Sequence, residues 1–262
     1  GRTQFSRGAD GRAVLGPVLR EYIISEAMHA LGVPTTRSLA VISTGRKIQR
    51  GSVAPGAVLV RVATSLIRVG SFQYSNISGG IELSQHLANY TITRHFPSLV
   101  AELSAPTPAT YASLFKAILQ RQADTVGKWT RLGFVHGALN TDNTLISGET
   151  VDYGPCAFME RYRGDAKFSS IDTYGRYKFE NQPMILGWNM ARLVETLLPL
   201  LGATPDEGMT AAQEALGEFD DLCEQAIRKE FATALGLDES DTGTVEQFRE
   251  LLYLHNPDIT TL

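Results

Sequence analysis

The sequence is poor in cysteine and contains no long apolar run. Its 262 residues include only two cysteines, Cys156 and Cys223, which form no Cys-x-x-Cys pair and no disulfide framework. We therefore expect a reducing compartment, either the cytoplasm of a bacterium or, in a eukaryote, the mitochondrion. No apolar run reaches the roughly 18 residues of a membrane span, so we expect no membrane contact.

Excess positive charge is also missing. The formal net charge is −4 and the pI is about 5.8, whereas nucleic-acid-binding domains are usually basic. We therefore expect no nucleic-acid partner. The 24 basic residues divide into 18 arginines and 6 lysines. This bias suits bidentate phosphate recognition but is also typical of a GC-rich genome, which we take to explain most of these arginines.

Zinc-type ligand spacing is absent from the sequence too. Four histidines share no ligand spacing with a cysteine or with one another, namely His29, His86, His95 and His255, so we expect no zinc site. At 43% hydrophobic and 20% charged residues, the chain is long enough for a large core, and we expect two lobes and a monomer. Gly1 is not an initiator methionine, so we expect the chain to be a fragment.

Hydrophobic periodicity predicts a mixture of helices and strands, the α+β class. Apolar residues recur at helical spacing in residues 17–31, with Pro17 in the first turn and Gly32 after the end. A core-facing stripe is predicted within residues 110–130; it consists of Leu114, Ile118, Gln122, Val126 and Trp129. The predicted helices are 17–31, 82–95, 110–130, 184–201, 209–235 and 244–254, and the predicted strands are 37–43 and 57–63.

Residues 133–158, GFVHGALNTDNTLISGETVDYGPCAF, concentrate the polar side chains that could perform chemistry. Five of these side chains fall within 17 positions: His136, Asn140, Asp142, Asn143 and Asp152. Residues 144–151 predict a β-hairpin, because two short β-branched runs flank a Gly148-Glu149 turn. Such a hairpin would bring Asn143 and Asp152 side by side.

This layout resembles the active site of a protein kinase, in which H-R-D-x-x-x-x-N is followed by a hairpin and D-F-G. His136 takes the place of the His, Asn143 that of the Asn, and residues 152–154 that of D-F-G. Ala138 stands where a kinase has the catalytic Asp that accepts the proton of the substrate hydroxyl. Asp142 is the one carboxylate left in the loop.

Further segments are similar to signatures of the selenoprotein O family of pseudokinases, and they follow the family's order. The family's loop is H-G-x-x-N-T-D-N followed by D-Y-G-P-x-x-F, which residues 136–143 and 152–158 match. The resemblance covers roughly residues 1–200. The other matching segments are SRGADGRAVL (6–15), REYIISEAMHALGVPTTRSLAV (20–41), PGAVLVRVATSLIRVGSF (55–72) and GRYKFENQP (175–183).

The resemblance implies a protein-kinase-like, two-lobed fold. Residues 1–80 would form a partial small lobe and residues 81–262 a helical large lobe. The small lobe would be incomplete here, because the family's phosphate-gripping Lys, in a Lys-Gly-Ala-Gly segment, aligns two positions before Gly1. Glu21, rather than Glu26, would be the counterpart of the kinase helix Glu that pairs with that Lys.

The resemblance also implies nucleotide contacts for four further residues, Asp10, Gly11, Arg61 and Arg68, the arginines contacting phosphate. The residues themselves leave alternatives open. Asp10-Gly11 is also a common turn dipeptide, and the two arginines are also typical of surface residues paired with carboxylates.

Asn143 and Asp152 are the candidate metal ligands, because amide and carboxylate oxygens suit Mg²⁺ or Mn²⁺. Asp152 would thereby also hold the nucleotide. The alternative is that residues 140–143 simply form an Asx turn before the hairpin. We expect His136 to be structural and to brace the loop through backbone hydrogen bonds.

The reaction that the resemblance implies is adenylyl transfer from ATP to a protein. ATP would bind in an orientation inverted relative to kinases, and AMP would pass to a Ser, Thr or Tyr hydroxyl whose proton Asp142 takes. Two rivals stay open. A conventional phosphotransferase would use the same metal ligands with normally oriented ATP, and a nucleotide-binding scaffold without catalysis fits the missing Lys segment.

Overall fold

The computed structural model describes residues 1–100 and 104–261, which form two compact units. The first unit comprises residues 1–64 together with 150–154, and the second comprises residues 65–149 and the chain from Pro155 onward. Both units contain helices and strands, so the protein is of mixed helix and strand composition, as the periodicity predicts.

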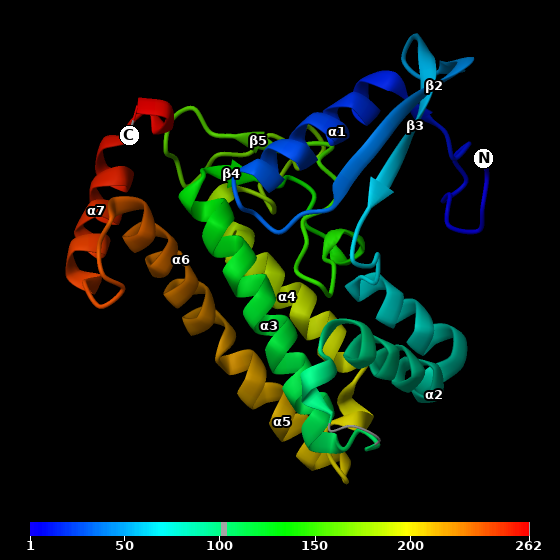
Figure 1. Ribbon diagram of the computed structural model, residues 1–262, viewed down its shortest axis with the longest axis vertical. Helices are drawn as coiled ribbons and strands as arrows, with labels where there is room; N and C mark the ends of the chain where they lie inside the picture. Colours follow the sequence, from blue (N-terminus) through cyan, green and yellow to red (C-terminus); the bar gives the residue numbers. More distant parts are fainter. Residues whose placement is uncertain (101–103, 262) are drawn as a thin grey trace. The chain divides into compact units, whose positions relative to one another are not determined.

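The first unit is a small antiparallel sheet with one helix against it (Figure 1). The sheet order is β1-β3-β2, with Ala13 opposite Ala57 and Val41 opposite Leu59. The pairing is irregular between Ser43 and Lys47. The elements of this unit are β1 (Ala13–Val14), α1 (Leu15–Ala30), β2 (Arg37–Gln49) and β3 (Val53–Val62). The predicted helix and both predicted strands are confirmed, and β2 and β3 are longer than expected.

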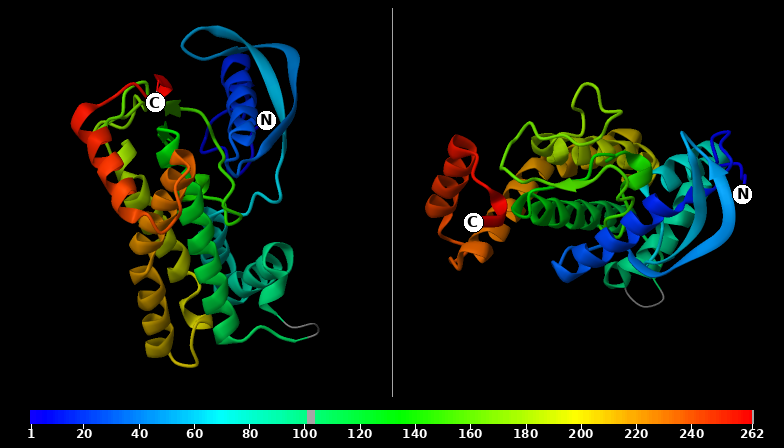
Figure 2. Two further views of the ribbon diagram at one scale, coloured as in Figure 1. Left: turned by 60° about the vertical axis from the view of Figure 1, so that its left-hand side comes forward. Right: turned by 90° about the horizontal axis from the view of Figure 1, so that it is seen from above.

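The second unit is mainly helical, with a two-stranded ribbon of β4 (Phe134–Val135) and β5 (Ala157–Phe158) (Figure 2). Its helices are α2 (Val69–His95), α3 (Pro108–Arg131), α4 (Gln182–Glu195), α5 (Pro205–Gly217), α6 (Phe219–Leu235) and α7 (Thr242–His255). Its 3₁₀ helices are η1 (Pro97–Leu99), η2 (Thr141–Asn143), η3 (Phe179–Asn181), η4 (Leu198–Leu200) and η5 (Ile259–Thr261).

The core of the second unit is built around α3, which packs along α6 (Figure 2). All five residues of the predicted stripe, from Leu114 to Trp129, are buried. Gly127 allows the close approach of the two helices, because a Cβ at this position would lie 2.9 Å from the backbone carbonyl of Ala226. The stripe prediction is therefore confirmed.

Three helix predictions need correction. The helix predicted at 209–235 is two helices that meet at Glu218, a break that lets Phe219 bury against Gly187 of α4. The helix predicted at 184–201 ends at Glu195, because Pro199 cannot continue a helical ladder. The helix predicted at 82–95 is the second part of α2, whose first part ends at Gly80 with a left-handed φ of 62°.

The predicted hairpin over residues 144–151 is wrong. Each of its halves pairs with a segment distant in the sequence: Leu145 bridges Arg68, and Thr150 bridges Thr35. A tight turn closed by a hydrogen bond from Gly148 N to Leu145 O lies between the halves. Backbone N–H groups of both runs donate to partners outside the predicted hairpin, Ile146 N to Ile67 O and Thr150 N to Pro34 O.

Within the described residues, no helix combines the length and apolar character that crossing a membrane requires.

Candidate functional site

The motif residues fall in two places, one in each compact unit. Residues 136–144, called here the Asp142 loop, belong to the second unit. Residues 152–154, called here the Asp152 turn, belong to the first unit together with Glu21 and Arg61. Asn143 and Asp152, the two candidate metal ligands, are thus divided between the units.

The Asp142 loop contains the Asx turn that the residues themselves predicted as an alternative. Asn140 Oδ1 accepts a hydrogen bond of 2.9 Å from Asp142 N and caps the 3₁₀ helix η2. Thr144 Oγ1 donates to Asn140 O at 3.0 Å. Asn140 thereby organises the backbone on both sides of Asp142, and the turn is compatible with either a structural or a catalytic role.

The carboxylate of Asp142 lies against the first turn of α2. A Cβ added to Gly70 would overlap Asp142 Oδ1, so only glycine permits this approach. The main chain of Asp142 is held at its carbonyl as well. This carbonyl accepts a hydrogen bond of 3.0 Å from Arg68 Nη1. The packing therefore fixes the Asp142 side chain at a defined position beside the start of α2.

Arg68 is therefore placed beside the Asp142 loop. Its Nε donates to Leu66 O at 3.3 Å, while Nη1 reaches the loop. Arg68 precedes α2, and its backbone N donates to Ser71 Oγ at 3.2 Å. Arg68, for which the resemblance implies a phosphate contact, thus holds the loop that carries Asp142, the candidate base.

Asn143 and His136 occupy different positions in the loop. Asn143 Nδ2 donates to Ala138 O at 2.8 Å, which orients the side-chain amide. His136 is fully buried beside Trp129, and its Nδ1 accepts a hydrogen bond of 3.3 Å from Ala138 N. The structural role predicted for His136 is confirmed, because the ring braces the loop from inside the core.

Three buried amide side chains hold the rest of the loop, and the sequence interpretation did not identify their role. Gln182 Oε1 accepts a hydrogen bond of 2.9 Å from His136 N, and Gln182 Nε2 donates one of 3.0 Å to Phe134 O. Asn189 Nδ2 donates to Leu139 O at 3.1 Å and to Thr144 Oγ1 at 2.8 Å. Gln122 Nε2 donates to Leu145 O at 2.7 Å.

A signal for these amides was present in the sequence. Gln122 and Asn189 are polar residues at core-facing positions of amphipathic helices, and buried polar groups are nearly always hydrogen-bonded. Asn189 Oδ1 is buried without a partner among the described residues. The partners themselves could not be read from the sequence, because they lie 45 to 50 residues from Asn189.

In the first unit, Glu21 holds the Asp152 turn. Its carboxylate accepts hydrogen bonds of 3.2 Å from Asp152 N and 2.7 Å from Tyr153 N. Asp152 has a left-handed φ of 67°, which is uncommon for a residue other than glycine and often marks a functional site. Arg20, the neighbour of Glu21 on α1, donates through Nε to the carbonyls of Tyr153 and Gly154. The turn is thus held through both its N–H and its C=O groups.

Arg61 of β3 pairs with Glu21 through Nη2. The carboxylate pairing that the residues left open is therefore present in the structure. Arg61 Nε is nevertheless buried and has no hydrogen-bond partner among the described residues. A buried donor without an acceptor costs free energy of folding. An oxygen atom of a ligand would supply the acceptor that Arg61 Nε lacks.

Asp10 and Gly11 form a turn at the start of the chain. Arg50 binds both carboxylate oxygens of Asp10 at 3.0 and 2.9 Å, and Arg12 N donates to one of them at 3.0 Å. The hydrogen bond from Arg50, followed by that from Arg12, lowers the pKa of Asp10 to about 2. Gly11 has a left-handed φ of 61°, as turn glycines often do.

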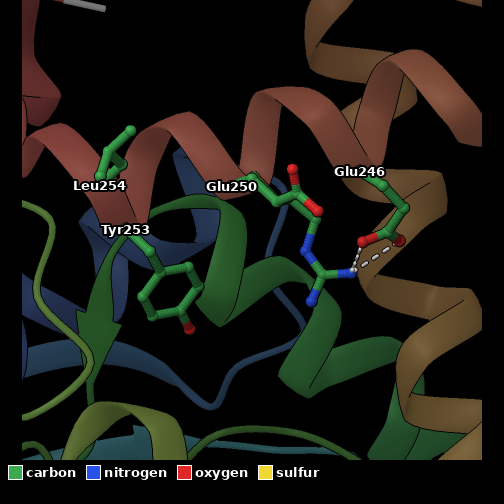
Figure 3. A pocket seen from close by; sticks show the side chains of 5 residues that line it. Glu246, Glu250, Tyr253 and Leu254 are labelled. Carbon is green, nitrogen blue, oxygen red and sulfur yellow. Dashed lines mark hydrogen bonds and ion pairs between the residues drawn. The ribbon is translucent and has the colours of Figure 1, made fainter.

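A pocket of about 430 Å³ lies elsewhere, on α7 (Figure 3). Glu246, Glu250, Tyr253 and Leu254 line it along one helix, together with Arg249. The guanidinium of Arg249 is already paired with Glu246 and with Glu224 of α6. The pocket contains none of the motif residues, so it is not the candidate site.

Metal binding would depend on mixed oxygen ligands. No group of three or more His, Cys, Asp or Glu side chains in the described ranges is arranged to hold a metal ion. Asn143 and Asp152 supply an amide and a carboxylate oxygen, the hard donors that Mg²⁺ and Mn²⁺ prefer when phosphate oxygens complete the shell. The donor chemistry therefore fits such an ion.

The chain as a whole matches one protein family. The family is described as Protein adenylyltransferase SelO, and the match covers residues 1–256. The chain belongs to this family, which confirms the resemblance drawn from the motifs.

Among its relatives are bacterial proteins named Protein nucleotidyltransferase YdiU. The chain is 99% identical over 262 residues to that of Corynebacterium glutamicum, which covers 100% of this chain and 55% of the relative. It is 65% identical over 265 residues to that of Corynebacterium efficiens, a match that covers 100% of this chain and 54% of the relative. It is 51% identical over 263 residues to that of Geobacillus kaustophilus, a match that covers 99% of this chain and 53% of the relative. The chain therefore spans about half the length of these relatives.

Two glutamates of α1 allow a matched test of the Asp152 turn. Glu21→Ala would leave one buried and one part-buried backbone N–H group, and Arg61, without their acceptor, so we expect a loss of roughly 3 kcal/mol in the free energy of unfolding. Glu26→Ala removes a more exposed pair with Arg37, whose side chain is 44% exposed, and should cost less than about 1 kcal/mol. Urea unfolding measures both, and equal losses would contradict the role given to Glu21.

Proposed function

We propose that this chain carries the nucleotide-binding and catalytic part of a protein adenylyltransferase. A Ser, Thr or Tyr hydroxyl of a protein attacks the α-phosphorus of ATP, the bond to the β-phosphate oxygen breaks, and pyrophosphate leaves. The hydroxyl proton passes to Asp142, and the protein retains AMP as a phosphodiester. Family membership, which implies ATP use and a protein substrate, supports this proposal.

The observation that carries the proposal is the position of Asp142. The place of a kinase base is taken by Ala138, and Asp142 is the one carboxylate in residues 136–144. Its backbone N and O are both held, by Asn140 and Arg68, and its side chain is confined by Gly70. A general base needs such a fixed position within reach of the proton that it removes.

Asn143 and Asp152 are the proposed ligands of a divalent ion, Mg²⁺ or Mn²⁺. Such an ion, when bound with ATP, neutralises charge on the phosphates. Asn143 is oriented for this by its bond to Ala138 O, and Asp152 by its left-handed backbone and by Glu21. The two proposed ligands belong to different compact units, Asn143 to the second and Asp152 to the first.

We propose further that ATP is inverted relative to kinases, with its β- and γ-phosphates toward Arg61 and Arg68. The unpartnered Nε of Arg61 supports this orientation, because a phosphate oxygen would supply the missing acceptor. Asp10 and Gly11 would line the nucleotide near the start of the chain. Glu21 would pair with the Lys of the upstream segment while it holds the Asp152 turn.

The fold that this function needs is a kinase-like arrangement of two lobes divided near residue 80, with the small lobe completed by chain upstream of Gly1. We propose that the enzyme is a monomer and acts in a reducing compartment of a bacterium. The bacterial relatives and the low cysteine content, two residues in 262, support the reducing compartment.

Labelled ATP distinguishes adenylyl transfer from its two rivals. With the full-length enzyme and a mixture of protein acceptors, label from the α-phosphate should appear on protein, and label from the γ-phosphate should not. Label from the γ-phosphate alone would instead identify a phosphotransferase. No label from either position would leave a nucleotide-binding scaffold.

Substitution of the two aspartates separates base from metal ligand. Asp142→Asn should lower kcat by about a hundredfold or more while ATP–metal affinity is retained, because a general base acts only in proton transfer. Asp152→Asn should weaken the ATP–metal complex as well, and Asn tolerates the left-handed backbone of this position. Titration calorimetry with ATP and Mg²⁺ provides the comparison. If both variants lose binding equally, Asp142 is not the base.

Arg61 tests the orientation of ATP. In the full-length enzyme, Arg61→Ala should lower the affinity for ATP by about ten- to a hundredfold and the affinity for AMP much less. The reason is that AMP lacks the β- and γ-phosphates that a charge-assisted hydrogen bond would hold. Arg37→Ala, which breaks a comparable pair with Glu26, should change neither affinity. Equal weakening of ATP and AMP by Arg61→Ala would speak against the inverted orientation.

A further inference from the structure

Residues 161–178, called here the Tyr174 loop, present large apolar side chains to solvent from a firmly held backbone. Tyr174 is 98% exposed and Ile171 is 88% exposed, and Phe168 of the same loop is also exposed. Exposed side chains of this size on a surface loop commonly mark an interaction site when they are grouped. Neither the Asp142 loop nor the Asp152 turn includes these residues.

The backbone of the Tyr174 loop is held by a buried carboxylate. Asp172 is 8% exposed and accepts hydrogen bonds of 2.8 Å from both Arg176 N and Tyr177 N. Lys167 Nζ donates to the carbonyls of Asp172 and Thr173 at 3.2 and 3.1 Å. These bonds define the conformation of the segment that carries Ile171 and Tyr174.

The two ends of the loop are anchored to the core of the second unit. Phe179 N donates to Ala166 O at 2.9 Å, and the Phe179 ring packs edge-on against Tyr162. Asn181 Nδ2 donates to Gly175 O at 3.1 Å. A loop with this many fixed points loses little conformational entropy when a partner binds, which favours recognition.

Helix α4 adds two more apolar side chains to the same surface. Met184 and Trp188 are exposed and lie one helical turn apart, on the same side of α4. The guanidinium of Arg176 lies 4.8 Å from the centroid of the Trp188 ring, so the loop and the helix meet there. We define the Tyr174 surface by these side chains: Phe168, Ile171, Tyr174, Arg176, Met184 and Trp188.

The Tyr174 loop is rich in basic side chains. Residues 161–178 contain five basic side chains and two acidic ones, whereas the whole chain has a net charge of −4. Of the two acids, Asp165 pairs with Arg163, and Asp172 is buried against backbone N–H groups. Lys178 pairs with Glu180, which lies just beyond the loop. In the described part of the chain, no carboxylate forms an ion pair with Arg176.

The Tyr174 surface is also connected to the Asp142 loop through α4. Asn189, the residue after Trp188, is fully buried and donates to Leu139 O and Thr144 Oγ1 of that loop. One helix therefore carries the exposed surface on one side and supports the candidate base on the other. A partner bound to Trp188 would lie on the same rigid element that positions Asp142.

We propose that the Tyr174 surface docks the protein substrate, and that it selects an acidic segment that also carries an apolar side chain. This inference rests on the proposed function, which makes a protein the acceptor of AMP. Arg176 forms no ion pair with a described carboxylate and is therefore able to attract one from a partner. The exposed aromatic and aliphatic side chains offer apolar contact area. Tyr, Trp and Arg are the residue types that contribute most to protein interfaces.

Charge reversal at Arg176 provides the test, with two synthetic peptides as probes. Both peptides carry one serine and two leucines, and their flanking residues are glutamate in one and lysine in the other. In the full-length enzyme, the glutamate peptide should be preferred, and Arg176→Glu should reverse the preference by about tenfold or more in KM. Tyr174→Ser should raise the KM of both peptides to the same degree.

Matched controls separate docking from folding and catalysis. Ile77→Ser on α2 and Arg46→Glu on β2 change an exposed apolar side chain and an exposed charge that do not belong to this surface, and should change neither peptide's KM. ATP affinity, measured by calorimetry, should be unchanged in every variant. A general structural defect would weaken both peptides and ATP together, which would overturn the inference.

Direct peptide binding, measured by fluorescence anisotropy, distinguishes the failure of this inference from failure of the proposed function. Suppose that the enzyme binds the glutamate peptide preferentially, that Arg176→Glu reverses this preference, and that no AMP is transferred. This result would sustain the docking surface and overturn the proposed activity. AMP transfer with equal KM for both peptides would overturn the docking surface alone. Protection of Tyr174 from modification in the full-length enzyme without peptide would show that the rest of the chain or a second copy covers it, and would likewise overturn the inference.

Discussion

The Asp152 turn depends on one buried carboxylate, that of Glu21. The backbone N–H groups of Asp152 and Tyr153 belong to no strand, and Asp152 has a left-handed backbone that needs outside support. Glu21 accepts both hydrogen bonds, and Arg61 balances its charge. Because α1 carries both Arg20 and Glu21, the position of this helix determines the position of the turn.

The Asp142 loop is supported in a different way, by neutral amides. A glutamine side chain has both a donor and an acceptor, so Gln182 satisfies His136 N and Phe134 O at once. Asn189 and Gln122 hold two further carbonyls. Neutral amides avoid the large desolvation cost of a buried charge, and they leave Asp142 as the charged group within its loop. The Asp152 turn is thus held by charged side chains, and the Asp142 loop mainly by neutral amides.

Local patterns predicted most helices and strands, and failed where long-range partners decided the outcome. The stripe from Leu114 to Trp129 was identified because burial follows helical periodicity. The hairpin over residues 144–151 was wrong because Leu145 and Thr150 pair with Arg68 and Thr35 rather than with each other. The break at Glu218 was missed because it serves the burial of Phe219. In both failures the local propensity was compatible with the structure but did not determine it.

The sequence by itself determined the family, the motif residues and the identity of the remaining loop carboxylate, because these depend on residue type and spacing. Only the tertiary structure decided that Gly70 confines Asp142, that Arg61 pairs with Glu21, and that Arg68 binds the Asp142 loop. These contacts join residues 40 to 74 positions apart. Such contacts depend on how the elements pack and on which backbone groups remain to be satisfied, and local periodicity carries no information about either.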